Sequence, residues 1–448
     1  MRNFLLPVLL FPAISLSAQA QSDSERMDEV MQAATAVKTF HGVALVARHD
    51  SILLFKGYGL RDEEHGILHD TNSVFQIGSV TKQFTATVIL WLREQHQLSL
   101  QDKLIKYFPK YGYADKITIK NLLTHTSGIP EFSDAYFLEH QADKPFSQND
   151  FWDIVGEQGL HSDPGTEFEY SNSNYMLLGY IIEMVSGKSY EQIVREVIFN
   201  KAGMTHSGFD FAHLSSPFKS VGYEVVHDTA YHRTKMEDSS ASFAAGAIYT
   251  TAGDLYRWNQ ALYSNAIISQ ASLEEAYTAG MGGYGYGWYI QSGPGYFSVA
   301  HAGGIWGFQS YIKRFPRDHS CIILLCNEIL SFGDYATSLQ RILYHEPNYY
   351  IPRKEIRMTP DSLVPYTGQY ELVEKPAFKA DISIREGHLM VTWTHLEPQE
   401  IYAEKKDFFH FRVYNSQIDF KRDEGGRVTG FVAMGTGSTY MYRRIKTP

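Results

Sequence analysis

The chain has 448 residues, of which 44% are hydrophobic and 14% aromatic, so it is long enough for two or three domains with folded cores. Its formal net charge is −10 and it contains no basic run, which argues against a nucleic acid or an anionic membrane surface as its partner. Its two cysteines and 18 scattered histidines show no zinc-ligand spacing, so we expect neither a metal site nor another cofactor.

The first twenty residues have the pattern of a secretory signal peptide. Arg2 precedes a short apolar run, and the segment ends in Ala18-Gln19-Ala20, a small-residue cleavage site. The apolar run is too short to span a bilayer and is interrupted by Pro7 and Pro12. We therefore expect residues 1–20 to be cleaved off, leaving a periplasmic or secreted protein without a stable membrane anchor.

The next segments predict a helix and a hairpin. Ser22-Asp23-Ser24-Glu25 has the spacing of a capping box and should open a helix that runs toward Val37. Gly42–Ala47 and Ile52–Phe55 are apolar runs on either side of a polar turn, which is typical of a β-hairpin.

Ser79-Val80-Thr81-Lys82 stands at the mouth of an apolar stretch, Phe84–Leu92, that reads as a buried helix. A serine and a lysine three residues apart on a helix lie on one face, so the amine can take the proton of the hydroxyl. The spacing alone is weak, because Ser216-Pro217-Phe218-Lys219 repeats it. The residues after that second copy favour turn and strand, so we interpret it as a solvated loop.

Two polar segments of the middle region could assist such a serine. Leu122–Pro130 contains His125, which by itself is best interpreted as a structural histidine. In Tyr170-Ser171-Asn172, a tyrosine beside a lysine ammonium can hold its proton loosely and act as a general base or acid. The asparagine can hydrogen-bond the lysine or a substrate amide. The same spacing recurs at Tyr263-Ser264-Asn265, where the end of a helix is the simpler interpretation.

Helical patterns dominate from residue 79 to about residue 200, and glycine-punctuated strands return between residues 283 and 327. A helix-rich middle between strands from both ends predicts an α+β fold, with an antiparallel sheet flanked by helices and an all-helical insertion. Cys321 and Cys326 share one buried strand and point to opposite faces, so we expect no disulfide between them.

Two nucleotide-binding patterns are rejected. Gly280–Gly285 matches the dinucleotide fingerprint but is followed by a strand pattern rather than the required helix. Gly187-Lys188-Ser189 mimics the end of a phosphate loop, yet Gly187 is more simply the C-cap of the helix Tyr175–Val185. No Gly-x-Ser-x-Gly elbow is present, which argues against an α/β-hydrolase.

Within the strand region, His301-Ala302-Gly303-Gly304 would let a substrate approach the backbone and could supply an oxyanion-hole N–H, although a tight turn explains it equally well. The character of the chain then changes. Residues 351–365 read as a proline-punctuated linker between a domain of residues 21–350 and a C-terminal domain of residues 366–448. Short alternating segments in the latter predict a small all-β barrel or sandwich.

Taken in order, Ser-x-x-Lys, Leu-Leu-Thr-His-Thr-Ser-Gly, Tyr-x-Asn and His-x-Gly resemble the serine β-lactamase and penicillin-binding-protein superfamily over roughly residues 25–345. The chain looks most like the branch of class C β-lactamases, D-aminopeptidases and family-VIII-type esterases. This resemblance implies a role for each of seven residues. Ser79 would be the acyl-forming nucleophile, and Lys82 would lower the pKa of its hydroxyl or accept its proton. Tyr170 would be the general base for acylation and would activate the hydrolytic water, while Asn172 would hold the lysine and the substrate amide. His301 would line the edge strand, Gly303 would give clearance, and the N–H groups of Ser79 and Gly304 would form the oxyanion hole.

One departure from the family narrows the expected substrate. Classical β-lactamases carry Lys-Thr-Gly where this chain has His301-Ala302-Gly303, which lacks both the lysine charge and the threonine hydroxyl that hold a substrate carboxylate. The resemblance therefore implies an exported serine hydrolase that acts on esters or D-amino-acid-containing peptides and has weak or no β-lactamase activity. Its expected partner is thus a small-molecule or peptide substrate. A penicillin-binding sensor with little turnover and a true class C-like β-lactamase remain as alternatives. The C-terminal domain is similar to the lipocalin-like barrels appended to some of these enzymes.

Overall fold

A computed structural model describes residues 21–133, 142–226, 230–293, 296–328, 333–346, 349–385, 387–394, 398–411, 416–435 and 438–445. The predicted signal peptide lies outside these residues. Among the helices that the structure does describe, none has the length and apolar character that crossing a bilayer requires.

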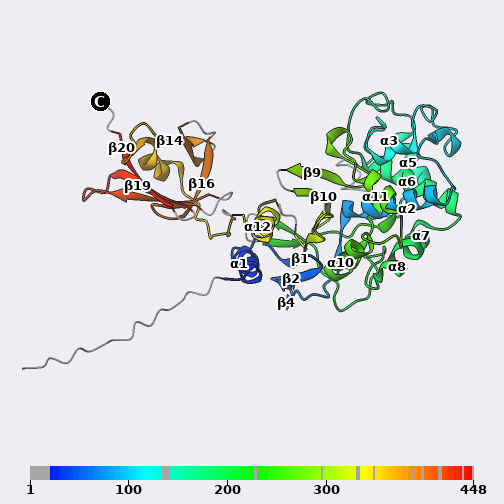
Figure 1. Cartoon of the computed structure of the whole chain (residues 1–448), viewed down its shortest axis with the longest axis horizontal. Helices are drawn as coiled ribbons and strands as arrows, with labels where there is room; N and C mark the ends of the chain where they lie inside the picture. The colour runs from blue at the N-terminus through cyan, green and yellow to red at the C-terminus, as the bar shows by residue number, and fades with distance from the viewer. Residues whose placement is uncertain are drawn as a thin grey trace, which may run out of the picture.

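A six-stranded antiparallel sheet forms the centre of the larger domain (Figure 1). Its order is β2-β1-β12-β11-β10-β9, so strands from both ends of the domain meet in the middle. The strands are β1 (Gly42–Arg48), β2 (Ser51–Tyr58), β9 (Tyr289–Gly293), β10 (Tyr296–Ile305), β11 (Phe308–Phe315) and β12 (Ser320–Cys326). The predicted hairpin is β1 and β2, and β1 also pairs with β12.

Strand β12 is buried along its whole length and divides the core into two. Cys321 joins the apolar cluster on the side of the large helical region, whereas Cys326 joins the cluster on the opposite side. Both thiols are free, as the five-residue separation on one strand predicts.

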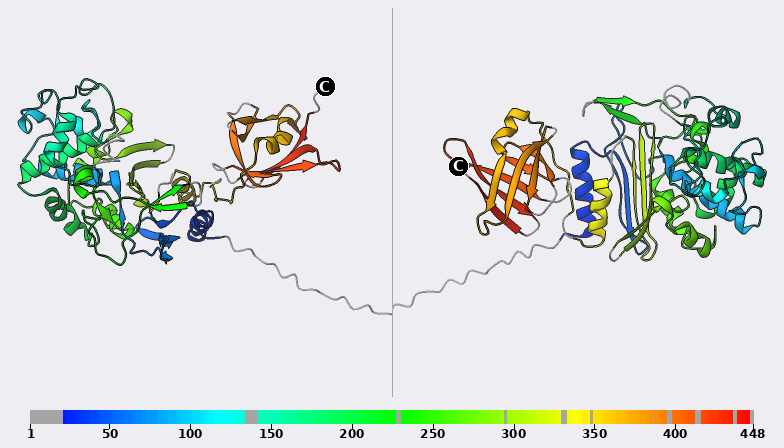
Figure 2. Two further views of the ribbon diagram at one scale, coloured as in Figure 1. Left: turned by 180° about the vertical axis from the view of Figure 1, so that it is seen from behind. Right: turned by 90° about the horizontal axis from the view of Figure 1, so that it is seen from above.

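Two helices, α1 (Asp23–Ala36) and α12 (Gly333–Leu343), cover one face of this sheet (Figure 2, right). The predicted capping box opens α1: the Ser22 side chain accepts from the N–H of Glu25, and the Glu25 side chain accepts from the N–H of Ser22. Apolar residues of both helices, such as Val30 and Leu339, are fully buried against the sheet.

The opposite face carries the helical region, which contains the remaining described helices of this domain (Figures 1 and 2). These are α2 (Thr81–Glu94), α3 (Ile119–Leu123), α5 (Gln148–Val155), α6 (Asn172–Ser186), α7 (Tyr190–Val194), α8 (Asn200–Ala202), α9 (Ser239–Gly246), α10 (Ala252–Ala261) and α11 (Gln270–Ala276). Short strand pairs edge it: β3 (Leu60–Asp62) with β4 (Ile67–Leu68), β5 (Phe75–Gln76) with β8 (Tyr249–Thr250), and β6 (Tyr223–Val226) with β7 (Ala230–Arg233). Helix α2 is almost wholly buried, as its apolar run predicts.

The C-terminal region is a closed, antiparallel eight-stranded barrel. Its strands are β13 (Gly368–Leu372), β14 (Lys379–Arg385), β15 (His388–Trp393), β16 (Gln399–Lys405), β17 (Phe408–His410), β18 (Gln417–Arg422), β19 (Val428–Gly435) and β20 (Ser438–Arg444), and the short helix α13 (Pro360–Leu363) precedes them. The barrel closes because β13 pairs with β20. This confirms the predicted fold class, an α+β domain with a helical insertion followed by an all-β barrel.

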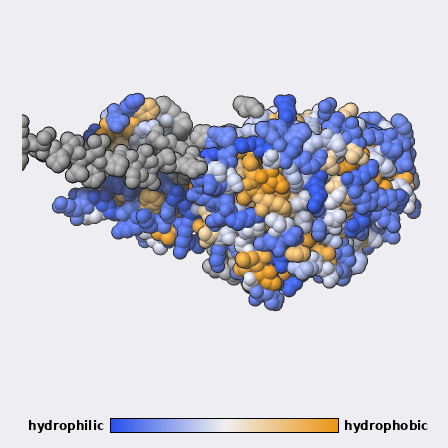
Figure 3. All heavy atoms as spheres, turned by 60° about the horizontal axis from the view of Figure 1, so that its bottom comes forward, coloured by the Kyte–Doolittle hydropathy of each residue, from blue (hydrophilic) through white to orange (hydrophobic). Residues whose placement is uncertain are grey.

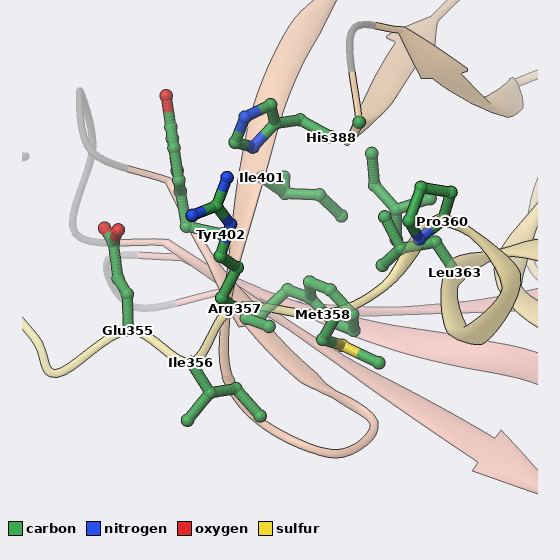
Figure 4. Close-up of a pocket in the computed structure, with 13 residues that line it drawn as sticks. Glu355, Ile356, Arg357, Met358, Pro360, Leu363, His388, Ile401 and Tyr402 are labelled. Atoms are coloured by element: carbon green, nitrogen blue, oxygen red, sulfur yellow. The ribbon is translucent and has the colours of Figure 1, made fainter. Parts of the chain in front are cut away.

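The barrel lies beyond α1 and α12, on the side of the sheet away from the helical region (Figure 2, right). It has a cavity of about 500 Å³ of its own, where Met358, Pro360 and Leu363 of the connecting segment approach Ile401 and Tyr402 (Figure 4). On the face that Figure 3 shows, apolar residues gather only in small patches between polar ones, as is usual for a protein surface.

Candidate active site

Ser79 lies on a tight turn that leads into the buried helix α2. The turn is the 3₁₀ helix η1 (Gly78–Val80), and α2 begins two residues after Ser79. Gly78 has a φ of +48°, and a Cβ at this position would lie 2.7 Å from the carbonyl oxygen of Gly304 on β10. Only glycine combines this conformation with so close an approach, so the turn holds Ser79 directly against β10.

Lys82, one helical turn further on, is fully buried beside Ser79. Its Nζ donates to Ser79 Oγ at 3.0 Å, to Asn172 Oδ1 at 2.7 Å and to the Ala245 carbonyl oxygen at 2.9 Å. Burial lowers the pKa of Lys82 to about 7, although the negative charge of Glu131 acts against this shift. Much of Lys82 is therefore uncharged near neutral pH, and its lone pair can accept the proton of the serine hydroxyl.

Tyr170 reaches the same point from the segment that precedes α6. Its side chain hydrogen-bonds that of Ser79, and Lys82 Nζ lies 5.0 Å from the centre of its ring. Burial raises the pKa of Tyr170 far above its ordinary value, and the charge of Glu131 adds to this rise. This is the reverse of the expectation that the lysine loosens the tyrosine proton. Desolvation keeps Tyr170 protonated, so Lys82 is the better base in the free protein.

His125 supports Tyr170 from behind. It is fully buried, its ring lies 4.3 Å from that of Tyr170, and its Nδ1 accepts from the N–H of Ser171 at 3.2 Å. Asn174 Nδ2 lies 3.2 Å from the same nitrogen. These contacts fit the structural role predicted for His125, since they fix the segment that carries Tyr170 and Asn172.

Asn172 is the first residue of α6 and links Lys82 to the carboxylate of Glu131. Its Oδ1 accepts from Lys82, and its backbone N–H donates to Glu131 Oε2 at 2.5 Å. Ser133 donates to the other oxygen of Glu131 through both its N–H and its hydroxyl. Sequence reasoning missed Glu131, although it directly follows the Leu122–Pro130 segment that had been singled out.

Strand β10 supplies His301, Gly303 and Gly304. Strand β9 pairs with β10 only as far as Ala300, so the residues of β10 that follow Ala300 are left open to the site on this edge. A Cβ on Gly303 would lie 2.0 Å from the Ile77 carbonyl oxygen and 2.9 Å from the Ser79 nitrogen, so any side chain here would clash with the turn that carries Ser79. A Cβ on Gly304 would meet nothing within 4 Å.

His301 is buried and hydrogen-bonded on both ring nitrogens. Its Nδ1 lies 2.6 Å from the Ala302 carbonyl oxygen and its Nε2 lies 3.0 Å from the Tyr284 hydroxyl. Burial lowers the pKa of His301 to about 3, and the nearby charge of Lys82 contributes. His301 is therefore neutral at physiological pH and cannot replace the lysine of Lys-Thr-Gly as a cation.

Two cavities meet at Ser79. The first, of about 430 Å³, is lined by Gly78, Ser79, Glu131, Phe132, Ser133, Asn172, Glu237, Ala241, Ser242, Ala245, Gly246, Gly304, Ile305, Trp306 and Gln309. The second, of about 320 Å³, is lined by Ser79, Tyr170, Tyr289, Gln291, Ala300, His301, Ala302 and Tyr311. All seven predicted site residues except Lys82 and Gly303, which are buried beneath, contribute to these walls. Among the described residues that line them, none is a lysine or an arginine.

The Ser-x-x-Lys copy at Ser216 and Lys219 does not form a comparable pair. Lys219 Nζ donates to the Ala212 carbonyl oxygen, and Ser216 Oγ accepts from the N–H of Phe218. Gly187 caps α6 with a φ of +67°, as expected, which removes the phosphate-loop interpretation. In the described part of the chain, Asp62, Glu64 and His65 bring ligand atoms within 4.8 Å of one another at the end of β3 and the exposed turn after it, but they do not line the cavities at Ser79.

Comparison with known proteins identifies one matching family and solved structures with a similar fold. The family model described as Beta-lactamase matches residues 27–343. PbpX of Bacillus subtilis (strain 168), which carries a provisional assignment as a penicillin-binding protein, is 35% identical over 314 residues, covering 68% of this chain and 76% of PbpX.

Two solved structures share the fold at lower identity. The octameric penicillin-binding protein homologue from Pyrococcus abyssi has a TM-score of 0.66 at 20% identity, covering 93% of this chain and 99% of that one. The D-amino acid amidase from Ochrobactrum anthropi SV3, complexed with D-phenylalanine, has a TM-score of 0.62 at 22% identity, covering 72% of this chain and 98% of that one.

Proposed function

Because the chain belongs to the Beta-lactamase family, we propose that it is an exported serine hydrolase that forms a covalent acyl-enzyme with esters or D-amino-acid-containing peptides. One observation carries the proposal. A buried lysine, whose pKa is lowered to about 7, lies 3.0 Å from the hydroxyl of a half-buried serine at the meeting point of two cavities.

In acylation, uncharged Lys82 takes the proton of Ser79 as Oγ attacks the substrate carbonyl carbon. The N–H groups of Ser79 and Gly304 receive the developing oxyanion, a contribution of about 3 kcal/mol for each such donor. Collapse of the tetrahedral intermediate breaks the bond to the leaving group. Tyr170 protonates the departing atom and regains its proton from the Lys82 ammonium.

Deacylation reverses these proton movements with water in place of the leaving group. Lys82, again uncharged, draws a proton through Tyr170 from the water that attacks the acyl carbon. The ester bond to Ser79 breaks, and the serine oxygen takes up that proton. No metal or organic cofactor is needed for either half of the reaction.

Substrate choice follows from the charges beside Ser79. His301 is neutral and no described lysine or arginine lines the two cavities, so a substrate carboxylate finds no cation there. Penicillins and cephalosporins carry that carboxylate, which favours esters and D-amino-acid amides over β-lactams. The D-amino acid amidase among the structural neighbours fits this preference.

The decisive experiment uses the mature protein and its Ser79→Ala variant. We expect turnover of p-nitrophenyl esters or D-amino-acid nitroanilides, weak labelling by a fluorescent penicillin, and loss of both in Ser79→Ala. Full activity of the Ser79→Ala variant would contradict the proposed mechanism. Stable penicillin labelling without turnover would favour a penicillin-binding sensor, and fast penicillin hydrolysis a class C-like β-lactamase.

Export rests on residues 1–20 and is tested separately. We expect the protein in the periplasmic fraction or the medium, with an N-terminus that begins at Gln21. An intact Met1 in the cytosolic fraction would contradict the proposal.

A further inference from the structure

Glu237 is a buried acid in the wall of the larger cavity. It lies just before α9, its exposed fraction is 7%, and the Trp306 side chain donates a hydrogen bond to it. Glu131 lines the same cavity, and none of the other described lining residues is basic. Two carboxyl groups therefore face one cavity that offers them no cation from its walls.

An ionised carboxylate is costly to bury without a positive partner. Burial accordingly raises the pKa of Glu237 to about 7, and the neighbouring charge of Asp238 contributes to the rise. A ligand that carries its own positive charge would supply the missing partner. The apolar side chains of Phe132, Ile305 and Trp306 in the same wall would accept the uncharged part of such a ligand.

The position of the proton donor shows which part of a substrate this cavity receives. Tyr170 lines the smaller cavity, on the other side of Ser79. Because the leaving group must lie beside the group that protonates it, the smaller cavity receives the leaving group. The acyl group then occupies the larger cavity, with Asn172 and Glu237.

We propose that Glu237 determines specificity by binding the protonated amine of the substrate's acyl group. The preferred substrates are then esters and amides of amino acids with a free amine, rather than their N-acylated counterparts. This inference rests on the proposed acyl-enzyme function and names its substrate class. A charge-assisted hydrogen bond between the amine and the buried Glu237 carboxylate is the source of the preference.

The test compares D-alanine p-nitroanilide with N-acetyl-D-alanine p-nitroanilide at pH 7, below the pKa of about 7.7 to 8.0 of a free α-amine. We expect the wild-type kcat/KM to be about tenfold or more higher for the free amine, mainly through KM. Glu237→Gln should abolish most of this ratio, and Glu237→Asp, which keeps the charge, should retain part of it. Glu157→Gln, on an exposed residue that does not line the cavity, is the matched control and should leave the ratio unchanged.

Each outcome separates this inference from the proposed function. Equal hydrolysis of both substrates by the wild type, or a preference that survives in Glu237→Gln, overturns the role of Glu237 while the acyl-enzyme mechanism stands. Absence of Ser79-dependent hydrolysis of either substrate, and of p-nitrophenyl esters, overturns the proposed function itself. If Glu237→Gln does not fold, the ratio of kcat/KM for the two substrates in the wild type and in Glu237→Asp still tests the role of Glu237.

Discussion

At the scale of single residues, the reactivity of Ser79 depends on the charge of one amine. Lys82 is surrounded by acceptors and rings: Asn172 and the Ala245 carbonyl oxygen accept from it, and the Tyr170 and Tyr175 rings lie at 5.0 and 5.5 Å. This setting stabilises an ammonium only in part, because Lys82 is fully buried and its ammonium is desolvated. The balance leaves the pKa of Lys82 near 7, where a lysine can act as a base.

The pH dependence of acylation follows from this pKa. Below about pH 7 Lys82 is an ammonium and cannot take a proton, so kcat/KM for p-nitrophenyl acetate should rise with pH through a midpoint near 7. The charge of Glu131 raises the pKa of Lys82, so Glu131→Gln should move this midpoint to lower pH. The acetate ester carries no amine, which keeps substrate binding at Glu237 out of the measurement. A profile whose midpoint does not move in Glu131→Gln would contradict this account.

Gly303 and Gly304 should differ sharply when each is replaced by alanine. A methyl group on Gly303 overlaps the Ile77 carbonyl oxygen and presses on the Ser79 nitrogen, so Gly303→Ala should lower kcat by about a hundredfold, the cost of disturbing one oxyanion donor. Gly304→Ala, where the methyl group meets open space, should fold normally and lose far less activity toward small esters. Steady-state kinetics with p-nitrophenyl acetate decide, and equal losses in the two variants would argue against the steric explanation.

The order of the motifs predicts most of these residues, but their protonation states could be inferred only from their surroundings in the folded protein. Ser79 and Lys82 are recognisable by spacing, and Tyr170 and His301 by their neighbours in the chain. Glu131 and Glu237 carry no motif, because their importance comes from facing a cavity built by distant segments. The protonated state of Tyr170 was also out of reach, since it depends on burial.

At the scale of elements, helix α6 begins at a residue of the active site and ends at a glycine cap. Its first residue, Asn172, holds Lys82, and its C-cap, Gly187, has a φ of +67° in open space. Helices of this kind are predictable from apolar periodicity and a terminal glycine. Strand β9 was harder to place, because the strand pattern that follows Gly285 begins at Tyr286, whereas β9 begins at Tyr289.

The cap at Gly187 gives a clean test of backbone conformation. Because no side chain crowds this position, Gly187→Ala should destabilise the protein only through its positive φ, by roughly 1 kcal/mol. Gly187→Asn should cost less, since asparagine tolerates the left-handed conformation better. Thermal or urea unfolding of the three proteins measures this, and an equal loss in both variants would contradict the conformational explanation.

At the scale of the whole molecule, the barrel lies on one side of the sheet, and the helical region, whose helices α2 and α6 carry Lys82 and Asn172, lies on the other (Figure 2). The larger domain contacts the barrel through the Tyr350 and His410 rings, 6.3 Å apart, and the connecting segment contacts it through the ion pair of Arg353 with Glu404. None of the described residues that line the cavities at Ser79 comes from the barrel.

Removal of the barrel should therefore leave the chemistry largely intact. A chain that ends at Lys354 retains both apolar clusters of the larger domain, including Tyr350. We expect its kcat/KM for p-nitrophenyl acetate to stay within a few-fold of that of the full chain. Loss of activity in a truncated protein whose circular dichroism spectrum shows a folded domain would mean that the barrel takes part in the site.

The sequence by itself determined the local elements, the fold class and the family, because capping, apolar periodicity and motif order are written along the chain. Tertiary structure alone decided which groups are buried together, and hence which of them carry charge. The lowered pKa values of Lys82 and His301 and the raised pKa values of Tyr170 and Glu237 are all consequences of desolvation. Desolvation arises only when β10, α2, α6 and α9 pack together, so no stretch of sequence contains it.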